Sequence, residues 1–305
     1  MNSFDFENPQ FFSPKHFNNS EKKFGKLKYY PPYKINDEKW YKIFEKKLNL
    51  QLKKKEFFPL FRMSDGEFIF LLGRRFSQYN LIDKIYFIIQ HIKRSIYYMS
   101  TFYSSGRKGY CESYSYFDLR KLRKKFLHNL RYISKKGLIC PNFSPHPLVS
   151  TYQEDIKQIL NDNSIKLNYK NYFGYYFPTI FFLGKNIFKV FRNRKILIFT
   201  SDMYERNLNL KKNLISFKAK KVDFYFTSLN KPMLDKIDIK KLPFKPDFIL
   251  VAAGVGSVNI IYQLKNLKCA CIDCGYLVDA LSDINLAKKR IYHLNDYFYK
   301  KKKYF

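Results

Sequence analysis

Residues 57–73 read FFPLFRMSDGEFIFLLG: an apolar, aromatic run ends at Arg62, two carboxylates follow around one glycine, and a second apolar run closes the segment. This order predicts a strand, a tight turn and a short helix. Asp65 and Glu67 then lie at the carboxyl end of a strand, where open α/β sheets bind ligands. Carboxylates are hard oxygen ligands that suit Mg²⁺ or Mn²⁺, and Gly66 lets a ligand approach the backbone. We therefore expect a metal site at Asp65 and Glu67.

The same residues also fit a capping box, in which Ser64 caps the helix and Glu67 reaches back to the Ser64 amide before an apolar run. On spacing alone the capping interpretation is the commoner one, because short motifs often match by chance. The two interpretations do not exclude each other.

Two segments of the chain resemble one known family. Residues 62–68, RMSDGEF, resemble the Arg-Phe-Gly-Asp-Gly-Glu-Leu signature of bacterial glycosyltransferases with the GT-D fold. Residues 248–256 and 270–276 are similar to the closing segment of that family, which is a strand ending in Leu-Gly-Pro, a helix, and then Ala-Ile-Asp-Ile-Gly-His. The two matches occur in the family's order.

The sequence also departs from the family pattern. Met63-Ser64 replace Phe-Gly, Val255 stands where the family has proline, and Tyr276 stands where it has histidine. The resemblance covers residues 57–80 and 195–280 and is remote.

In the GT-D family the Asp-x-Glu motif binds a divalent metal and the diphosphate of a nucleotide-sugar donor. The resemblance therefore implies a metal-dependent glycosyltransferase with Mn²⁺ or Mg²⁺ held through Asp65 and Glu67. It implies transfer of a sugar from a nucleoside-diphosphate sugar, with a UDP-sugar as the expected donor, to a hydroxyl of a glycan or lipid-linked glycan. The expected setting is synthesis of surface polysaccharide or glycoprotein glycan.

The second half of the chain alternates between buried-type strands and helical patterns. The expected strands are residues 195–200, 222–227, 248–253 and 268–273. This alternation predicts an α/β fold with a Rossmann-like, mostly parallel sheet flanked by helices, and the resemblance makes it GT-D-like.

The chain is expected to hold one main domain. We predict an irregular lead-in over residues 1–36, a GT-D-like glycosyltransferase domain over 37–292 with its Rossmann-like half at about 195–280, and a basic aromatic tail over 293–305. Helical spacing of apolar residues further predicts helices over residues 37–55, 81–99, 117–136 and 151–160.

Further candidates lie at the ends of the expected strands. The expected donor-binding residues are Arg62, Ser64, Gly66, Arg206, Gly254, Gly256 and Ser257. A Gly-x-Gly-Ser turn that opens a helix can cradle a phosphate with its amides, but a turn that only packs helix on strand fits equally well. The full dinucleotide fingerprint fails, because Asn259 occupies the position of the last glycine.

Arginines and acids at strand ends complete the candidate site. Arg62 and Arg206 suit phosphate, and Arg206 falls roughly where the family has an arginine, although a plain surface arginine is an equal alternative. Asp273 and Asp202 are candidates for a general base only because they are acids at strand ends.

Composition limits the class of protein. The chain has 305 residues, is 46% hydrophobic and 27% charged, and carries a formal charge of +32, which is typical of a globular protein with a polyanionic partner. The excess of Lys, Asn, Ile, Phe and Tyr also follows from an AT-rich genome. Because no nucleic-acid module is recognisable, we expect no specific nucleic acid and a peripheral contact with the membrane.

No signal peptide or spanning helix is recognisable, so we expect a cytoplasmic protein, at the inner face of the membrane. The aromatic segment 172–191 favours a core-packed helix over a membrane-lying one. Cys271 and Cys274 form a C-x-x-C, which we interpret as structural thiols because a zinc site needs a second pair.

Two other classes of function stay open. One is a Rossmann-type nucleotide-binding or methyltransferase-like protein that holds a nucleoside at residues 252–256 and leaves Asp65 and Glu67 without a metal. The other is a non-catalytic protein that binds polyanions or a membrane surface through its charge and residues 297–305, with steep salt dependence.

Overall fold

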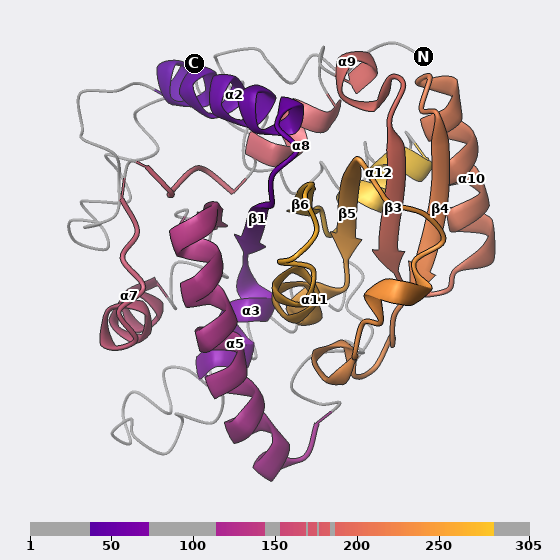
Figure 1. Ribbon diagram of the computed structural model, residues 1–305. Coiled ribbons are helices and arrows are strands. Elements are labelled where there is room, and N and C mark those ends of the chain that lie inside the picture. Colours follow the sequence, from indigo (N-terminus) through magenta and orange to yellow (C-terminus); the bar gives the residue numbers. More distant parts are fainter. Residues whose placement is uncertain are drawn as a thin grey trace, which may run out of the picture.

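The computed structural model describes residues 37–72, 114–143, 153–168, 170–175, 177–183 and 187–283. Six strands of this part of the chain form one sheet in the order β2-β1-β6-β5-β3-β4, and all five neighbouring pairs are parallel (Figure 1). The strands are β1 (Phe58–Met63), β2 (Leu138–Pro141), β3 (Lys195–Thr200), β4 (Lys221–Phe226), β5 (Phe248–Ala252) and β6 (Ala270–Asp273). The predicted α/β fold with a Rossmann-like parallel sheet is confirmed.

The strands are continuous apolar runs because both faces of the sheet are covered. Every residue of β1, β2 and β6 is buried, whereas the edge strand β4 exposes Lys221 and Phe226. This is the burial pattern of a parallel sheet sandwiched between helices.

Helices lie on both faces of the sheet. Figure 1 shows α5 (Tyr116–Lys136) and α11 (Ser257–Gln263) in front of it, where they pack together, and α12 (Leu277–Ser282) behind it, where it packs with α10 (Tyr204–Ser216). The other α-helices among the described residues are α2 (Asp37–Lys53), α3 (Asp65–Leu72), α7 (Gln153–Asp162), α8 (Phe177–Leu183) and α9 (Ile187–Phe191). The predicted helices at 37–55, 117–136 and 151–160 are confirmed.

The aromatic segment 172–191 is part of the core, as predicted. It forms α8 and α9, and the rings of Phe182 and Phe191 lie 5.7 and 6.3 Å from the ring of Phe248 on β5. Trp40 on α2 packs edge-on against Phe177 at 4.9 Å.

No α-helix connects β4 to β5. Residues 227–247 form two short 3₁₀ turns, η4 (Pro232–Leu234) and η5 (Ile239–Lys241), and bury part of their apolar side chains against the core. The amide group of Asn259 donates to the carbonyls of Met233 and Asp235, at 3.2 and 3.1 Å. These bonds anchor η4 to α11, close to the carboxyl edge of the sheet.

Helix α5 illustrates how local sequence sets an element. Ser115 caps it by accepting from the Asp118 amide at 3.2 Å, and the helix stops at Gly137. Gly137 has a φ of −149°, so the helix does not end in a left-handed turn. A Cβ at Gly137 would lie 1.8 Å from the carbonyl oxygen of Pro59, so glycine is required there by the close approach of β1.

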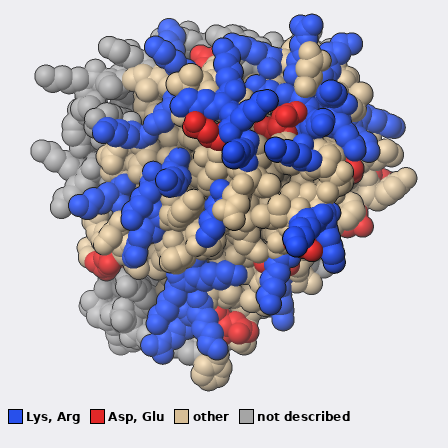
Figure 2. Space-filling model, in the orientation of Figure 1, with Lys and Arg blue, Asp and Glu red and all other residues tan. Residues whose placement is uncertain are grey.

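Several predictions fall outside the described residues: the helix at 81–99, the lead-in over 1–36 and the tail over 293–305. In the part of the chain that is described, no helix is both long and apolar enough to span a bilayer. On the face seen in Figure 2, Lys and Arg side chains far outnumber Asp and Glu.

The described cysteines, Cys140, Cys269, Cys271 and Cys274, are buried. Burial raises the pKa of the Cys140, Cys271 and Cys274 thiols. Thiols that stay protonated are poor nucleophiles and poor metal ligands, so these cysteines serve as packing residues.

Candidate active site

Because the six strands are parallel, the residues that follow them share one edge of the sheet. The chain leaves β1 toward α3 and α5 and leaves β6 toward α12, on the opposite face. It likewise leaves β3 toward α10 and β5 toward α11. Connections therefore diverge between β6 and both of its neighbours, β1 and β5, and again between β5 and β3, and such points are where open α/β sheets bind ligands.

The predicted site residues form two groups along this edge. Arg62, Ser64, Asp65, Gly66, Glu67 and Asp273 follow or end β1 and β6; Asp202, Arg206, Gly254, Gly256 and Ser257 follow β3 and β5. Ser257 links the two groups, since its hydroxyl bonds the Asp273 carboxylate.

The turn after β1 is a capping arrangement. The Glu67 carboxylate accepts from the Ser64 amide at 2.8 Å, and the Phe68 amide donates to the Ser64 carbonyl at 2.9 Å to close the first turn of α3. The Ser64 hydroxyl accepts from the side-chain amide of Asn142, which follows β2, at 3.2 Å. The reach of Glu67 back to Ser64 is thus as the capping interpretation predicts, while the Ser64 hydroxyl ties α3 to β2.

Arg62 lies in a buried cluster that we call the arginine cage: Arg62, Tyr175, Thr179, Asp273 and Tyr276. Arg62 is only 3% exposed, and its Cζ lies 5.1 Å from the ring centre of Tyr175 and 5.3 Å from that of Tyr276. Its Nη1 donates to the Thr179 hydroxyl at 3.4 Å, and that hydroxyl also bonds the Tyr276 hydroxyl at 3.2 Å. The guanidinium therefore joins β1 to α8 and to the start of α12.

Burial opposes the charge on Arg62, but the charged forms of Tyr175, Asp273 and Tyr276 outweigh it and raise the pKa of the guanidinium. Arg62 is thus a fixed cation within the cage.

Asp273 completes the hydrogen bonding of β1 where the β1–β6 ladder stops. The chain turns at Gly275, whose φ is +45°, so β6 offers no further carbonyl to the Arg62 amide. Asp273 Oδ2 accepts from that amide at 3.1 Å and lies 3.7 Å from Arg62 Nε. Burial raises the pKa of Asp273, against the opposing effects of Arg62, the Ser257 hydroxyl and the amides of Arg62 and Gly275.

The Gly-x-Gly-Ser turn after β5 is a packing turn. Gly254 has a φ of +50°, and the Ser257 hydroxyl accepts from the Ala253 amide at 3.2 Å. A Cβ on Gly256 would lie 2.3 Å from Pro232 Cβ, so this glycine lets η4 pack on the start of α11. The donor-binding role of the turn stays a prediction.

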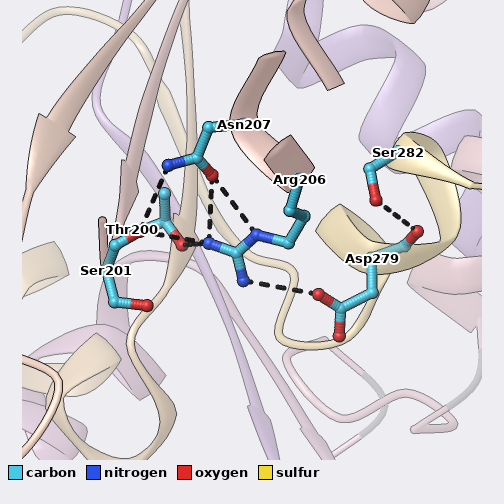
Figure 3. A network of polar contacts seen from close by, with 6 residues as sticks. All are labelled: Thr200, Ser201, Arg206, Asn207, Asp279 and Ser282. Carbon is cyan, nitrogen blue, oxygen red and sulfur yellow. Dashed lines mark hydrogen bonds and ion pairs between the residues drawn. The ribbon is translucent and has the colours of Figure 1, made fainter. Parts of the chain in front are cut away.

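Arg206 belongs to a second polar cluster, drawn in Figure 3. Its Nη2 donates to the Thr200 hydroxyl at 2.6 Å and to the Ser201 carbonyl at 3.2 Å, and its Nη1 pairs with Asp279 at 3.3 Å. Arg206 thereby fastens α10 and the end of β3 to α12. Arg206 is thus not a free surface arginine, because Nη1 and Nη2 both have partners within the protein. Its role in phosphate binding stays a prediction.

A divalent cation is the group that the resemblance implies here. Among the described residues no three His, Cys, Asp or Glu side chains lie close enough together to hold one metal ion. Mg²⁺ does not need such a group, because it commonly keeps several waters and binds one or two carboxylates together with the phosphates of a substrate. The Asp65–Glu67 pair in the first turn of α3 fits that smaller donor set, although one Glu67 oxygen is engaged by the Ser64 amide.

No protein-family model matches the sequence, and no curated protein matches it. Two solved structures of domain of unknown function 1792 are similar. One, described as having a distinct glycosyltransferase fold, aligns with a TM-score of 0.51 at 14% identity, over 88% of this chain and 86% of that chain. The other, a selenomethionine-substituted structure, aligns with a TM-score of 0.46 at 14% identity, over 80% of this chain and 86% of that chain. The fold is glycosyltransferase-like.

The predicted remote GT-D-like resemblance is thus confirmed at the level of the fold. At 14% identity the likeness concerns the fold alone.

Sequence reasoning missed four residues around the site: Asn142, Tyr175, Thr179 and Asp279. Asn142 directly follows β2, whose end lies at the same edge of the sheet as the ends of the other parallel strands, so a correct end for this strand would have pointed to it. Tyr175, Thr179 and Asp279 come from helical or irregular segments, where no spacing marks a single polar residue.

Proposed function

We propose that this protein is a metal-dependent glycosyltransferase. It would transfer a sugar from a nucleoside-diphosphate sugar to a hydroxyl of a glycan or lipid-linked glycan. A UDP-sugar is the expected donor. The proposed setting is the synthesis of surface polysaccharide or glycoprotein glycan in the cytoplasm, at the inner face of the membrane.

One observation carries the proposal: the Asp-x-Glu element opens α3 directly after β1, beside a point of diverging connections in a glycosyltransferase-like sheet. Its place in the fold agrees with its place in the GT-D-like sequence signature. A capping box alone needs no such position.

The residues of the turn have separate tasks in this proposal. Asp65 and Glu67 would bind Mn²⁺ or Mg²⁺, which when bound would stabilise the charge on the departing diphosphate. Gly66 has no side chain, so a phosphate oxygen can approach the amides of the first turn of α3. Glu67 also orients the Ser64 amide, at 2.8 Å.

An inverting transfer would also need a general base for the acceptor hydroxyl. Asp202 follows β3 and is exposed, whereas Asp273 is 5% exposed and accepts from Arg62, Ser257 and Gly275. Of the two predicted candidates, only Asp202 is exposed to solvent, and we propose it as the base.

The test separates capping from metal binding at Glu67. Glu67→Gln keeps an oxygen for the Ser64 amide but loses the charge, whereas Glu67→Ala loses both. Calorimetric titration with UDP and UDP-sugars, with and without Mn²⁺, is compared for wild type, Asp65→Asn, Glu67→Gln and Glu67→Ala. Glu205→Gln is the matched control, because Glu205 is an exposed acid in the first turn of α10, the helix after β3.

We expect Mn²⁺-dependent nucleotide binding by wild type and by Glu205→Gln. Binding should fall roughly tenfold or more in Asp65→Asn and Glu67→Gln while both stay folded, since an ionised ligand is lost. Full nucleotide binding by Glu67→Gln, with loss of stability only in Glu67→Ala, would reduce Glu67 to a helix cap and contradict the proposal.

A further inference from the structure

Helix α5 carries an unusual concentration of positive charge. Its 21 residues contain eight Lys or Arg and one acid, Asp118, a net charge of seven in 21 residues against 32 in 305 for the whole chain. The apolar side of the helix is buried against the sheet through Leu119, Leu122, Phe126, Leu130 and Ile133. The exposed cations of the helix therefore lie away from this apolar side.

Three of these cations bind the protein itself. The side chains of Arg123, Lys125 and Arg131 donate to the carbonyls of Phe70, Met233 and Asn163, at 2.6, 3.2 and 2.8 Å. They fasten α5 to α3, to η4 and to the segment after α7. The remaining cations are exposed; they are Arg120, Lys121, Lys124, Lys135 and Lys136.

The connection after β4 extends this surface. Tyr114 accepts from the Met233 amide at 3.0 Å, which places η4 beside the start of α5 and brings Lys236 close to Lys125. Burial and the charge of Lys236 lower the pKa of Lys125, so the cations are near enough to repel each other. We call Arg120, Lys121, Lys124 and Lys236 the basic face; Figure 2 views the molecule from the side on which α5 lies.

Large apolar side chains are exposed at the same end of α5. Phe117 in its first turn is 79% exposed, and Leu229 and Leu234 in the connection after β4 are 49% and 45% exposed. Leu229 and Leu234 follow β4, and α5 leads directly into the start of β2, so the first turn of α5 also lies toward the carboxyl edge of the sheet, where the Ser64–Glu67 turn follows β1. Cations flanked by exposed apolar side chains are the composition of a membrane-surface element.

We propose that the basic face, with Phe117, Leu229 and Leu234 as its apolar tips, binds an anionic lipid surface. Cations attract the headgroups, and the tips enter the region between headgroups and acyl chains. An outward-facing helix with scattered apolar tips suits a planar lipid surface better than a single strand of nucleic acid, which needs a groove lined with stacking aromatic residues. Membrane binding through the basic face does not depend on the proposed catalysis. If both hold, the Ser64–Glu67 turn would lie near the surface that carries a lipid-linked acceptor.

The test uses the full chain and two matched triple variants. Lys121→Gln, Lys124→Gln and Lys236→Gln remove three charges from the basic face. Lys211→Gln, Lys212→Gln and Lys220→Gln remove three exposed charges at α10 and before β4. Binding is measured by co-sedimentation with phosphatidylcholine vesicles, with and without phosphatidylglycerol, and in competition with single-stranded RNA.

We expect binding only to phosphatidylglycerol vesicles. Each cation near an anionic leaflet contributes roughly a fivefold gain, so the basic-face triple should bind on the order of a hundredfold more weakly and the α10 triple nearly as wild type. Equal losses in both triples would mean that net charge alone acts and would overturn the proposal. Preferential binding of RNA through the basic face, with no vesicle binding, would also overturn it.

A fluorescent reporter tests the apolar tips. The chain has one tryptophan, Trp40, which is buried on α2, so Phe117→Trp adds a distinct exposed signal. Its emission should shift to shorter wavelength on anionic vesicles. Bound protein with unshifted emission would place the contact elsewhere and contradict the proposed surface.

Discussion

Gly275→Ala adds one methyl group against the arginine cage and so measures how firmly the cage is held. The added Cβ would lie 2.3 Å from Arg62 Nη2. A long side chain normally swings away from such a contact, but Arg62 is 3% exposed and lies against the rings of Tyr175 and Tyr276. Its Nε also lies 3.7 Å from Asp273, so any movement separates a buried pair of charges.

The expected cost has two parts. An alanine at a φ of +45° costs about 1–2 kcal/mol in the left-handed region. Displacing Arg62 from its hydrogen bond and its carboxylate costs about 1–3 kcal/mol more, the range for bonds to charged groups. The free energy of unfolding should therefore fall by about 2–5 kcal/mol in urea titrations followed by the fluorescence of Trp40, with an unchanged denaturant slope.

A double-mutant cycle with Arg62→Met separates the two parts. Arg62→Met alone should be strongly destabilising, because it leaves Asp273 buried without its cation. In that background Gly275→Ala should cost only the backbone part, so the two single effects should exceed the double effect by about 1–3 kcal/mol. Additive effects would refute the reasoning, because they would show that the methyl group and the guanidinium do not compete for space.

Three other substitutions have expected outcomes. Gly256→Ala should destabilise by about 1–3 kcal/mol in urea, through overlap with Pro232 Cβ at 2.3 Å; an unchanged midpoint would contradict the packing role of this turn. The pKa of Asp273 is raised in the folded protein, so its contribution to the free energy of unfolding is present at low pH and is lost as the pH rises above 3.8. Asp273→Asn should abolish this loss of stability with rising pH. A loss that persists in the variant would assign it to another group. Asp279→Ala should lower stability by about 1 kcal/mol in thermal unfolding at low salt, since its pair with Arg206 is only partly exposed. In the Asp279→Ala background, Arg206→Ala should then cause a smaller loss of stability than it causes alone.

The sheet was predictable because its signals are local. Strands buried on both faces are short continuous apolar runs, and those at 195–200 and 248–253 are recognisable without their neighbours. The order of strands is not local: β1 lies between β2 and β6, which are separated from it by long stretches of chain. Only the resemblance linked the first segment to the last.

The roles of the site residues were harder to predict than their positions. Arg62 precedes Asp65 and Glu67 in the sequence, and we predicted that it binds a phosphate. In the structure its side chain is buried among Tyr175, Thr179 and Tyr276, which come from other segments. Residue type gives the charge of a group; only packing decides whether that charge faces a ligand or the protein.

The arginine cage and the capping of α3 act on one short segment from both sides. Asp273 fixes the Arg62 amide at 3.1 Å, and Glu67 fixes the Ser64 amide at 2.8 Å, so the chain is hydrogen-bonded on each side of Met63 before Asp65 begins the helix. Binding geometry is most reproducible when the supporting contacts are themselves fixed. A capping carboxylate is therefore compatible with a ligand site, and a buried arginine can serve that site through the backbone it positions.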